Sequence, residues 1–69
     1  MSALTLTNLG KSVAESTVGS GPEHAVLSIL YETGGPVDFE EIVDELRTDE
    51  EKASMVVRRL MSRGYVKEL

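Results

Sequence analysis

The residues best suited by type and spacing to bind a ligand are the basic side chains near the end of the chain. Positions 52–68 hold five basic residues and one acidic residue, a net charge of +4. Arginine and lysine contact phosphates, and arginine also donates hydrogen bonds to guanine. We therefore predict a surface for double-stranded DNA, with these contact residues: Lys52, Ser54, Met55, Arg58, Arg59, Arg63 and Lys67.

An acidic block precedes this basic segment. Positions 38–51 hold eight acidic residues and one basic residue, a net charge of −7, and the whole chain of 69 residues carries −5. Carboxylates at Asp49, Glu50 and Glu51 repel phosphates, although a glutamate also accepts from cytosine. The charge is segregated, so two hypotheses stay open: DNA binding, or interaction with a protein, including a second copy of this chain.

Other chemistry has little support in the sequence. The chain has no cysteine and a single histidine, His24, which excludes the common zinc sites. Neither glycine-rich stretch is followed by the Lys-Ser/Thr of a phosphate loop. A chain this short also leaves little room for a water-excluding catalytic cleft. We expect no enzyme, no metal and no cofactor, and we expect His24 to be exposed.

Length and composition indicate a single domain, residues 1–69, with a marginal core that dimerisation would stabilise. The start of the chain lacks a basic signal-peptide region, and no apolar run approaches a membrane span of about 20 residues. These features predict a cytoplasmic protein without a membrane partner. The acidic composition, with three lysines, resembles proteins of salt-adapted archaea.

Hydrophobic periodicity, together with residues that begin or end helices, predicts the helices and strands that position the basic residues. In the N-terminal part, residues 1–20, alternation predicts a strand at 4–7, and Thr7 is the expected N-cap of a helix at 8–17. Leu9 and Val13 share one face of that helix, and Gly10 weakens it. Residues 21–69 contain the other predicted helices and strands.

Three Ser/Thr/Asp-x-x-Glu capping boxes, at 20–23, 38–41 and 48–51, predict the starts of three more helices, at 21–33, 39–47 and 49–63. Gly34 and Gly64 are the expected stops of the first and last. Val37 contributes one or two strand residues, and a strand follows at 65–69. The predicted inward-facing residues are Val26, Ile29, Leu30, Thr33, Phe39, Ile42, Val43, Leu46, Ala53, Val56, Val57, Leu60 and Met61.

The segment from 39 to 66 resembles the winged helix-turn-helix family. Only about two residues separate its two helices, as in a helix-turn-helix, and the run of leucine, three residues, glycine, aromatic and valine at 60–66 recurs in this family. The resemblance covers about 22–69. It implies a mainly α fold with a small β-sheet and a three-helix core. It also implies transcription regulation, with 49–63 as the DNA recognition helix.

One departure from the family suggests a permuted order of elements. The family continues after this strand into a second wing strand and often a Leu-Thr-x-x-Gly-x-x-x-Ala element, and here that pattern occurs at 6–14 instead. We expect residues 4–7 to pair antiparallel with 65–69 and to replace the second wing strand. This pairing forms either within one chain or between two chains of a swapped dimer.

Overall fold

The computed structural model describes residues 3–16, 19 and 21–69. These residues form a mainly helical fold with one small sheet. The elements are β1 (Ala3–Leu6), α1 (Asn8–Ser16), α2 (Pro22–Thr33), β2 (Val37–Asp38), α3 (Phe39–Leu46), α4 (Glu50–Ser62) and β3 (Val66–Glu68). The predicted order of elements is confirmed, with bounds that shift by one or two residues.

The sheet is antiparallel and has the order β2-β1-β3, which places the first strand of the chain in the middle. The predicted pairing of the first and last strands is confirmed within one chain: Leu4 lies opposite Glu68, and Leu6 lies opposite Val66. On the other side of β1, Leu4 lies opposite Val37. The backbone N–H of Leu69 extends the β1–β3 ladder by donating to Ala3, at 2.9 Å.

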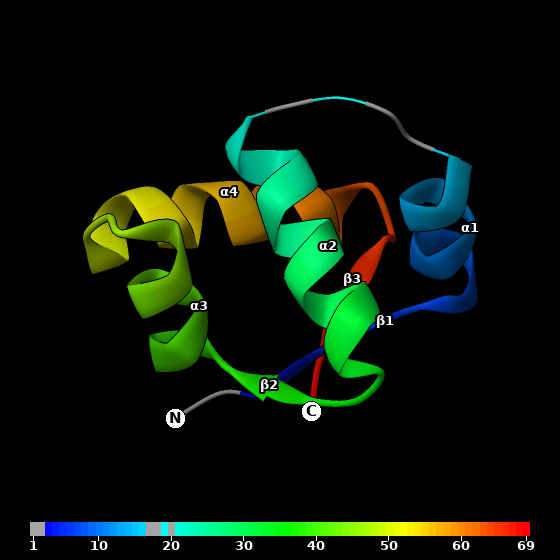
Figure 1. Ribbon diagram of the computed structural model, residues 1–69, viewed down its shortest axis with the longest axis horizontal. Coiled ribbons are helices and arrows are strands. Elements are labelled where there is room, and N and C mark those ends of the chain that lie inside the picture. The colour runs from blue at the N-terminus through cyan, green and yellow to red at the C-terminus, as the bar shows by residue number, and fades with distance from the viewer. Residues whose placement is uncertain (1–2, 17–18, 20) are drawn as a thin grey trace.

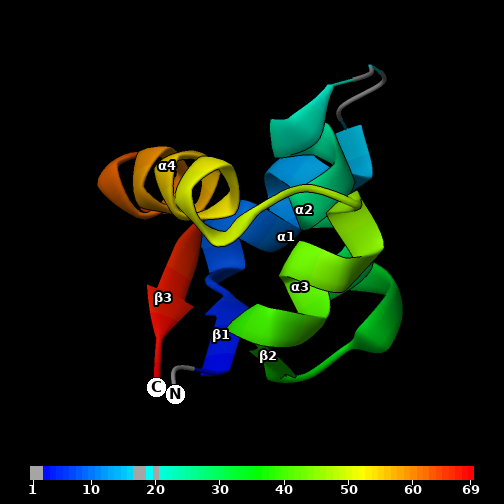
Figure 2. The same ribbon diagram turned by 90° about the vertical axis from the view of Figure 1, so that its left-hand side faces the viewer.

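The helices pack over one face of this sheet, where α2 lies between α1 and α3 and α4 crosses behind it (Figure 1). A turned view shows the sheet below α4 and α3 beside α2 (Figure 2). The side chains between these layers form one core, whose fully buried members come from every layer: Leu4, Val26, Leu30, Ile42, Ala53 and Leu60. Burial of each leucine, isoleucine or valine side chain in this set stabilises the fold by about 1.5–3 kcal/mol.

The first turn of α1 is fixed on the chain that follows α4. The Thr7 side chain accepts from Gly10 N–H at 2.9 Å, so the predicted N-cap is confirmed, and the same hydroxyl donates to the Gly64 carbonyl at 2.6 Å. Gly10 is buried, and a Cβ there would lie 1.9 Å from the Tyr65 carbonyl oxygen. Glycine at this position is therefore a requirement of the close approach.

The predicted faces of two helices need correction. Leu9 and Val13 were expected to share one face of α1, and Val13 does pack against the core, with Ala14 beside it, but Leu9 is 53% exposed. Leu27 was absent from the predicted face of α2 but is buried, whereas Thr33 is exposed. In both helices the buried side depends on how the helix lies on its neighbours, which helical spacing alone does not specify.

The predicted helix stops are confirmed, and the caps are partly wrong. Gly34 and Gly64 have φ values of 74° and 80° at the ends of α2 and α4. At the start of α4 the cap is Asp49, whose carboxylate accepts from Lys52 N–H at 2.8 Å, and not Thr48. Thr48 still belongs to the preceding corner, since its N–H donates to the Val43 carbonyl at 3.4 Å.

The other two capping boxes have different outcomes. Asp38 is the N-cap residue of α3 and also the end of β2, but its side chain makes no capping hydrogen bond. The N-cap of α2 is Gly21, with φ 112° and no side-chain cap. The predicted cap Ser20 lies outside the described residues, as does residue 17 of the helix predicted at 8–17.

Candidate nucleic-acid interface

Local signals in the α3–α4 corner fix the direction of α4. Arg47 adopts the left-handed conformation, with φ 55°, and its N–H donates to the Asp44 carbonyl at 3.1 Å. Asp49 then caps the first turn of α4. One side of α4 is buried in the core through Ala53, Val56, Val57 and Leu60. The opposite side of α4 is therefore left to solvent over its full length.

The exposed side of α4 changes charge after its first turn. Glu50 and Glu51 are exposed at the start, where carboxylates stabilise the helix dipole. From residue 52 to residue 63 every charged residue is a cation, and all four are exposed: Lys52, Arg58, Arg59 and Arg63. A polyanion approaching this helix thus meets carboxylates at one end and cations over the remaining turns.

The four cations do not share one face of α4. Lys52 and Arg59 lie on the side of α4 that faces α2, together with Met55. Ser54 and Arg58 lie on the other side, where they border a shallow hollow that also contains Glu68. Met55 is 52% exposed. The cations of α4 thus flank the helix on two sides.

Two of the cations contact an acidic side chain on α2. Arg63 forms an ion pair and hydrogen bond with the Glu23 carboxylate, and the Arg59 guanidinium lies 3.8 Å from the same carboxylate. Glu23 stands 40 residues before Arg63, so no spacing in the sequence could have indicated the pair. The sequence prediction missed Glu23, which neutralises part of the positive charge on this flank.

Lys67 lies apart from the other candidate residues. It is exposed on β3 and pairs across the strands with Thr5, while its neighbour Val66 is buried in the core. Since successive strand residues point to opposite faces, Lys67 lies on the outer face of the sheet, away from α4. An exposed lysine on an edge strand also discourages pairing with another strand.

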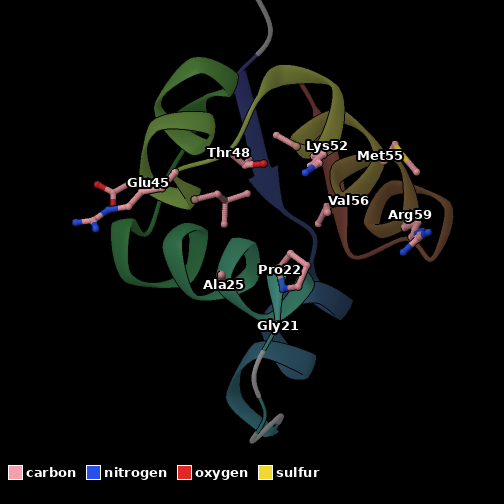
Figure 3. A pocket seen from close by; sticks show the side chains of 12 residues that line it. Gly21, Pro22, Ala25, Glu45, Thr48, Lys52, Met55, Val56 and Arg59 are labelled. Carbon is pink, nitrogen blue, oxygen red and sulfur yellow. The ribbon is translucent and has the colours of Figure 1, made fainter.

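A groove opens on the α2 side of α4. It has a volume of about 650 Å³ and lies between the start of α2, the α3–α4 corner and the first half of α4. Figure 3 shows Pro22 and Ala25 facing Thr48, Lys52 and Val56 across it. Apolar side chains line most of the groove, and charged side chains stand at its edges.

His24 is half-buried on α2, so the expectation of an exposed histidine is wrong. Its Nε2 atom lies 3.5 Å from the Ser28 hydroxyl oxygen, while Nδ1 is buried without a hydrogen-bond partner among the described residues. His24 lines a hollow that also contains Glu23 and Arg63.

Two absences concern residues 3–16, 19 and 21–69, the part of the chain that the structure describes. Within these ranges no group of three or more His, Cys, Asp or Glu side chains is arranged to hold a metal ion. No helix in the same part of the chain is long and apolar enough to cross a membrane.

Comparison with protein-family models, with curated proteins and with solved structures found no significant match to this chain.

Proposed function

We propose that this protein is a DNA-binding transcriptional regulator of the winged helix-turn-helix type, with α4 as its recognition helix. The observation that carries the proposal is the run of exposed cations along α4 after a tight corner with α3: Lys52, Arg58, Arg59 and Arg63. In a helix-turn-helix the second helix enters the major groove. Cations on both sides of α4 suit the two phosphate backbones that border that groove.

The order of the elements supports the same proposal. Helices α2, α3 and α4 follow one another with a short strand between the first two, and β3 follows α4 directly. The middle position in the sheet belongs to β1, which pairs with both other strands. In the proposed permuted winged helix, β1 takes the place of the second wing strand, and α1 replaces the trailing helix. The support from fold alone is an analogy.

The charges on α4 indicate where contact with DNA would occur. The first turn carries Glu50 and Glu51, which repel phosphate, so the later turns approach the duplex most closely. Arg58 has no ion-pair partner among the described residues, unlike Arg59 and Arg63, and is the strongest candidate for a base or phosphate contact. Met55, on the α2 side of α4 beside Lys52 and Arg59, would make an apolar contact with a thymine methyl group.

A salt-dependent titration tests the proposal. Fluorescence anisotropy of a labelled random-sequence duplex is measured with the full chain at 50 and 200 mM salt. About four phosphate contacts predict an affinity loss of roughly a hundredfold between the two conditions. The double variant R58A/R59A is expected to bind at least about tenfold more weakly at low salt, while K11A, which removes an exposed cation on α1, is the matched control. Absence of binding at low salt would refute the proposal.

The Glu23 carboxylate gives a second variant with the opposite expected sign. Replacing it by glutamine releases Arg59 and Arg63 for phosphate, so E23Q is expected to strengthen DNA binding about threefold at low salt. The control is E32Q, which removes an exposed carboxylate from the other end of α2. Equal affinity gains in both variants would mean that only the net charge matters and that the Glu23 ion pairs do not.

A further inference from the structure

The groove between α2, the α3–α4 corner and α4 combines an apolar floor with a cationic edge. The floor is formed by Pro22, Ala25, Leu46 and Val56. The edge carries Arg47, Lys52 and Arg59 with the Glu45 carboxylate, and the Glu23 carboxylate lies 3.8 Å from Arg59, so the edge keeps a net positive charge. We propose that this groove binds an acidic amphipathic helix of a partner protein. This proposal does not require DNA binding, although the groove shares Lys52, Met55 and Arg59 with the proposed DNA interface, so the two partners would compete for this flank of α4.

Charge complementarity determines one half of the partner's chemistry. The chain has seven basic residues and a net charge of −5, yet three of the seven cations stand at the edge of this one groove. Cations gathered on an otherwise acidic surface attract an anionic partner and repel a cationic one. The partner therefore carries carboxylates where it meets Lys52 and Arg59.

The apolar floor of the groove determines the second feature of the partner, an apolar surface. Val56 and Leu46 also belong to the molecular core or pack against it, so the floor is a rigid apolar surface. A nucleic-acid backbone presents charged phosphates on small sugars and has no branched apolar side chains, whereas leucine, isoleucine and valine side chains can fill a concave apolar floor. Met55 is exposed at the edge, and its flexible side chain suits an adaptable protein contact.

The spacing of the cations matches a helical partner. Lys52 and Arg59 are seven residues apart on α4, which corresponds to about 10.5 Å along the helix axis. Two carboxylates seven residues apart on a second helix have the same separation and lie on one face of it. An apolar stripe beside them would fill the floor, as in other complexes that seat a helix in a groove.

A second copy of this chain is a less suitable occupant. The acidic surface that a copy could offer is the exposed side of α3, with Glu40, Glu41, Asp44 and Glu45. The apolar side of α3 is already packed in its own core through Ile42 and Leu46. This surface of a second copy therefore offers carboxylates without a free apolar stripe to fill the floor.

The test uses a fluorescein-labelled helical peptide of about four turns, with two glutamates seven residues apart beside a leucine stripe. A matched peptide has lysine at both glutamate positions. Binding to the full chain is followed by anisotropy, and the site is mapped by NMR amide shifts. We expect a Kd of roughly 10–100 µM for the acidic peptide, at least about tenfold weaker binding of the lysine peptide, and shifts at Ala25, Leu46 and Val56.

Two variants locate the binding. K52E/R59Q removes cations from the groove edge and is expected to weaken binding about tenfold. R58E introduces a carboxylate on the other flank of α4 and is expected to change the Kd less than twofold. Circular dichroism checks that each variant is folded, which is expected because all three side chains are exposed.

Several results would overturn the proposal. These are equal affinity for both peptides, equal losses in K52E/R59Q and R58E, shifts confined to other surfaces, or no saturation by the acidic peptide up to about 1 mM. If a DNA duplex shifts the groove amides while the peptide does not, the groove belongs to the DNA interface and the peptide proposal fails. Because the peptide titration contains no DNA, failure of the proposed DNA-binding function leaves its result unchanged.

Discussion

The β1–α1 unit and the α3–α4 pair are both two elements joined by a short connection, but different interactions hold them in place. In the α3–α4 pair the corner depends on neighbours in sequence: Arg47 donates to Asp44, and Asp49 caps the next turn. In the β1–α1 unit the corner depends on distant backbone. The Thr7 hydroxyl donates to the Gly64 carbonyl, 57 residues away, and the Thr7 N–H donates to the Tyr65 carbonyl.

The difference shows which half of the molecule depends on the other. The α3–α4 corner has its signals within a few residues, so its geometry is encoded locally. The first turn of α1 takes its position from the backbone that ends α4 and begins β3. Substitutions in the β1–α1 unit should therefore be costly where they disturb this backbone contact, and those in the α3–α4 corner should cost only a local cap.

The largest expected effect comes from G10A. The added Cβ would lie 1.9 Å from the Tyr65 carbonyl oxygen, which forces α1 away from β3. Overpacking of this kind costs 1–3 kcal/mol and occasionally more, and a contact with backbone places G10A at about 3 kcal/mol or above. Urea unfolding followed by circular dichroism measures the loss. Small domains are stable by roughly 0.05–0.15 kcal/mol per residue, so this loss is a large fraction of the free energy of unfolding and is expected to lower the urea midpoint strongly.

Gly35 supplies the matched control for this prediction. No atom lies within 4 Å of a Cβ built there, and its φ is not in the left-handed region. G35A is therefore expected to change the free energy of unfolding by no more than about 0.5 kcal/mol. A loss below 1 kcal/mol in G10A would contradict the close approach of α1 to Tyr65, and with it the contrast between the two corners.

The next largest effect is expected for T7V, which keeps the shape of the side chain and removes its hydroxyl. Two hydrogen bonds disappear, one from Gly10 N–H at 2.9 Å and one to the Gly64 carbonyl at 2.6 Å. At about 1 kcal/mol for each bond, the expected loss is about 2 kcal/mol in urea unfolding. A loss of only about 1 kcal/mol, as for the removal of an ordinary N-cap, would mean that the hydrogen bond to Gly64 contributes nothing to stability.

In the locally encoded α3–α4 corner, D49A is expected to lower the free energy of unfolding by less than T7V does. The Asp49 carboxylate caps α4 through one hydrogen bond to Lys52 N–H, and replacement of such a cap by alanine typically costs about 1 kcal/mol. The double variant T7V/D49A is expected to lose the sum of the two single losses, because the two caps share no partner. A coupling above about 0.5 kcal/mol would show that the two corners are not independent.

Much of the fold could be predicted because so many of its signals are local. The order of elements, the glycine stops and the inner faces of α3 and α4 followed from spacing and from residue types that end helices. The Thr48 cap was wrong by one residue because Asp49, next to it, is an equally good cap. Two adjacent candidates of similar strength cannot be ranked without the path of the corner.

What could not be predicted depends on contacts between distant residues. Gly10 was interpreted as a weakness of its helix, but the close approach of Tyr65 makes it necessary. In the candidate site, the sequence identified the cations of α4 but gave no sign that Glu23 contacts two of them. Whether cations are free or paired, and on which flank they lie, depends on how α2 crosses α4.

The smallest expected effect concerns the side chain that ties α1 to α2. The Tyr31 hydroxyl donates to the Glu15 carboxylate at 2.9 Å, and this hydrogen bond, together with the carboxylate charge, raises the pKa of Tyr31 above its ordinary value of 10.0. A raised pKa means that the neutral phenol is favoured in the folded state. This hydrogen bond therefore contributes stability below the ordinary phenol pKa, and that contribution is lost as the pH rises through the raised value.

In a Y65F background, which leaves Tyr31 as the single tyrosine, ultraviolet titration near 295 nm should show a lower midpoint in E15Q than in its parent. The exposed E32Q substitution should leave the midpoint unchanged. Identical midpoints in E15Q and its parent would leave the backbone contacts of Thr7 and Gly10 as the interactions that hold α1 in place.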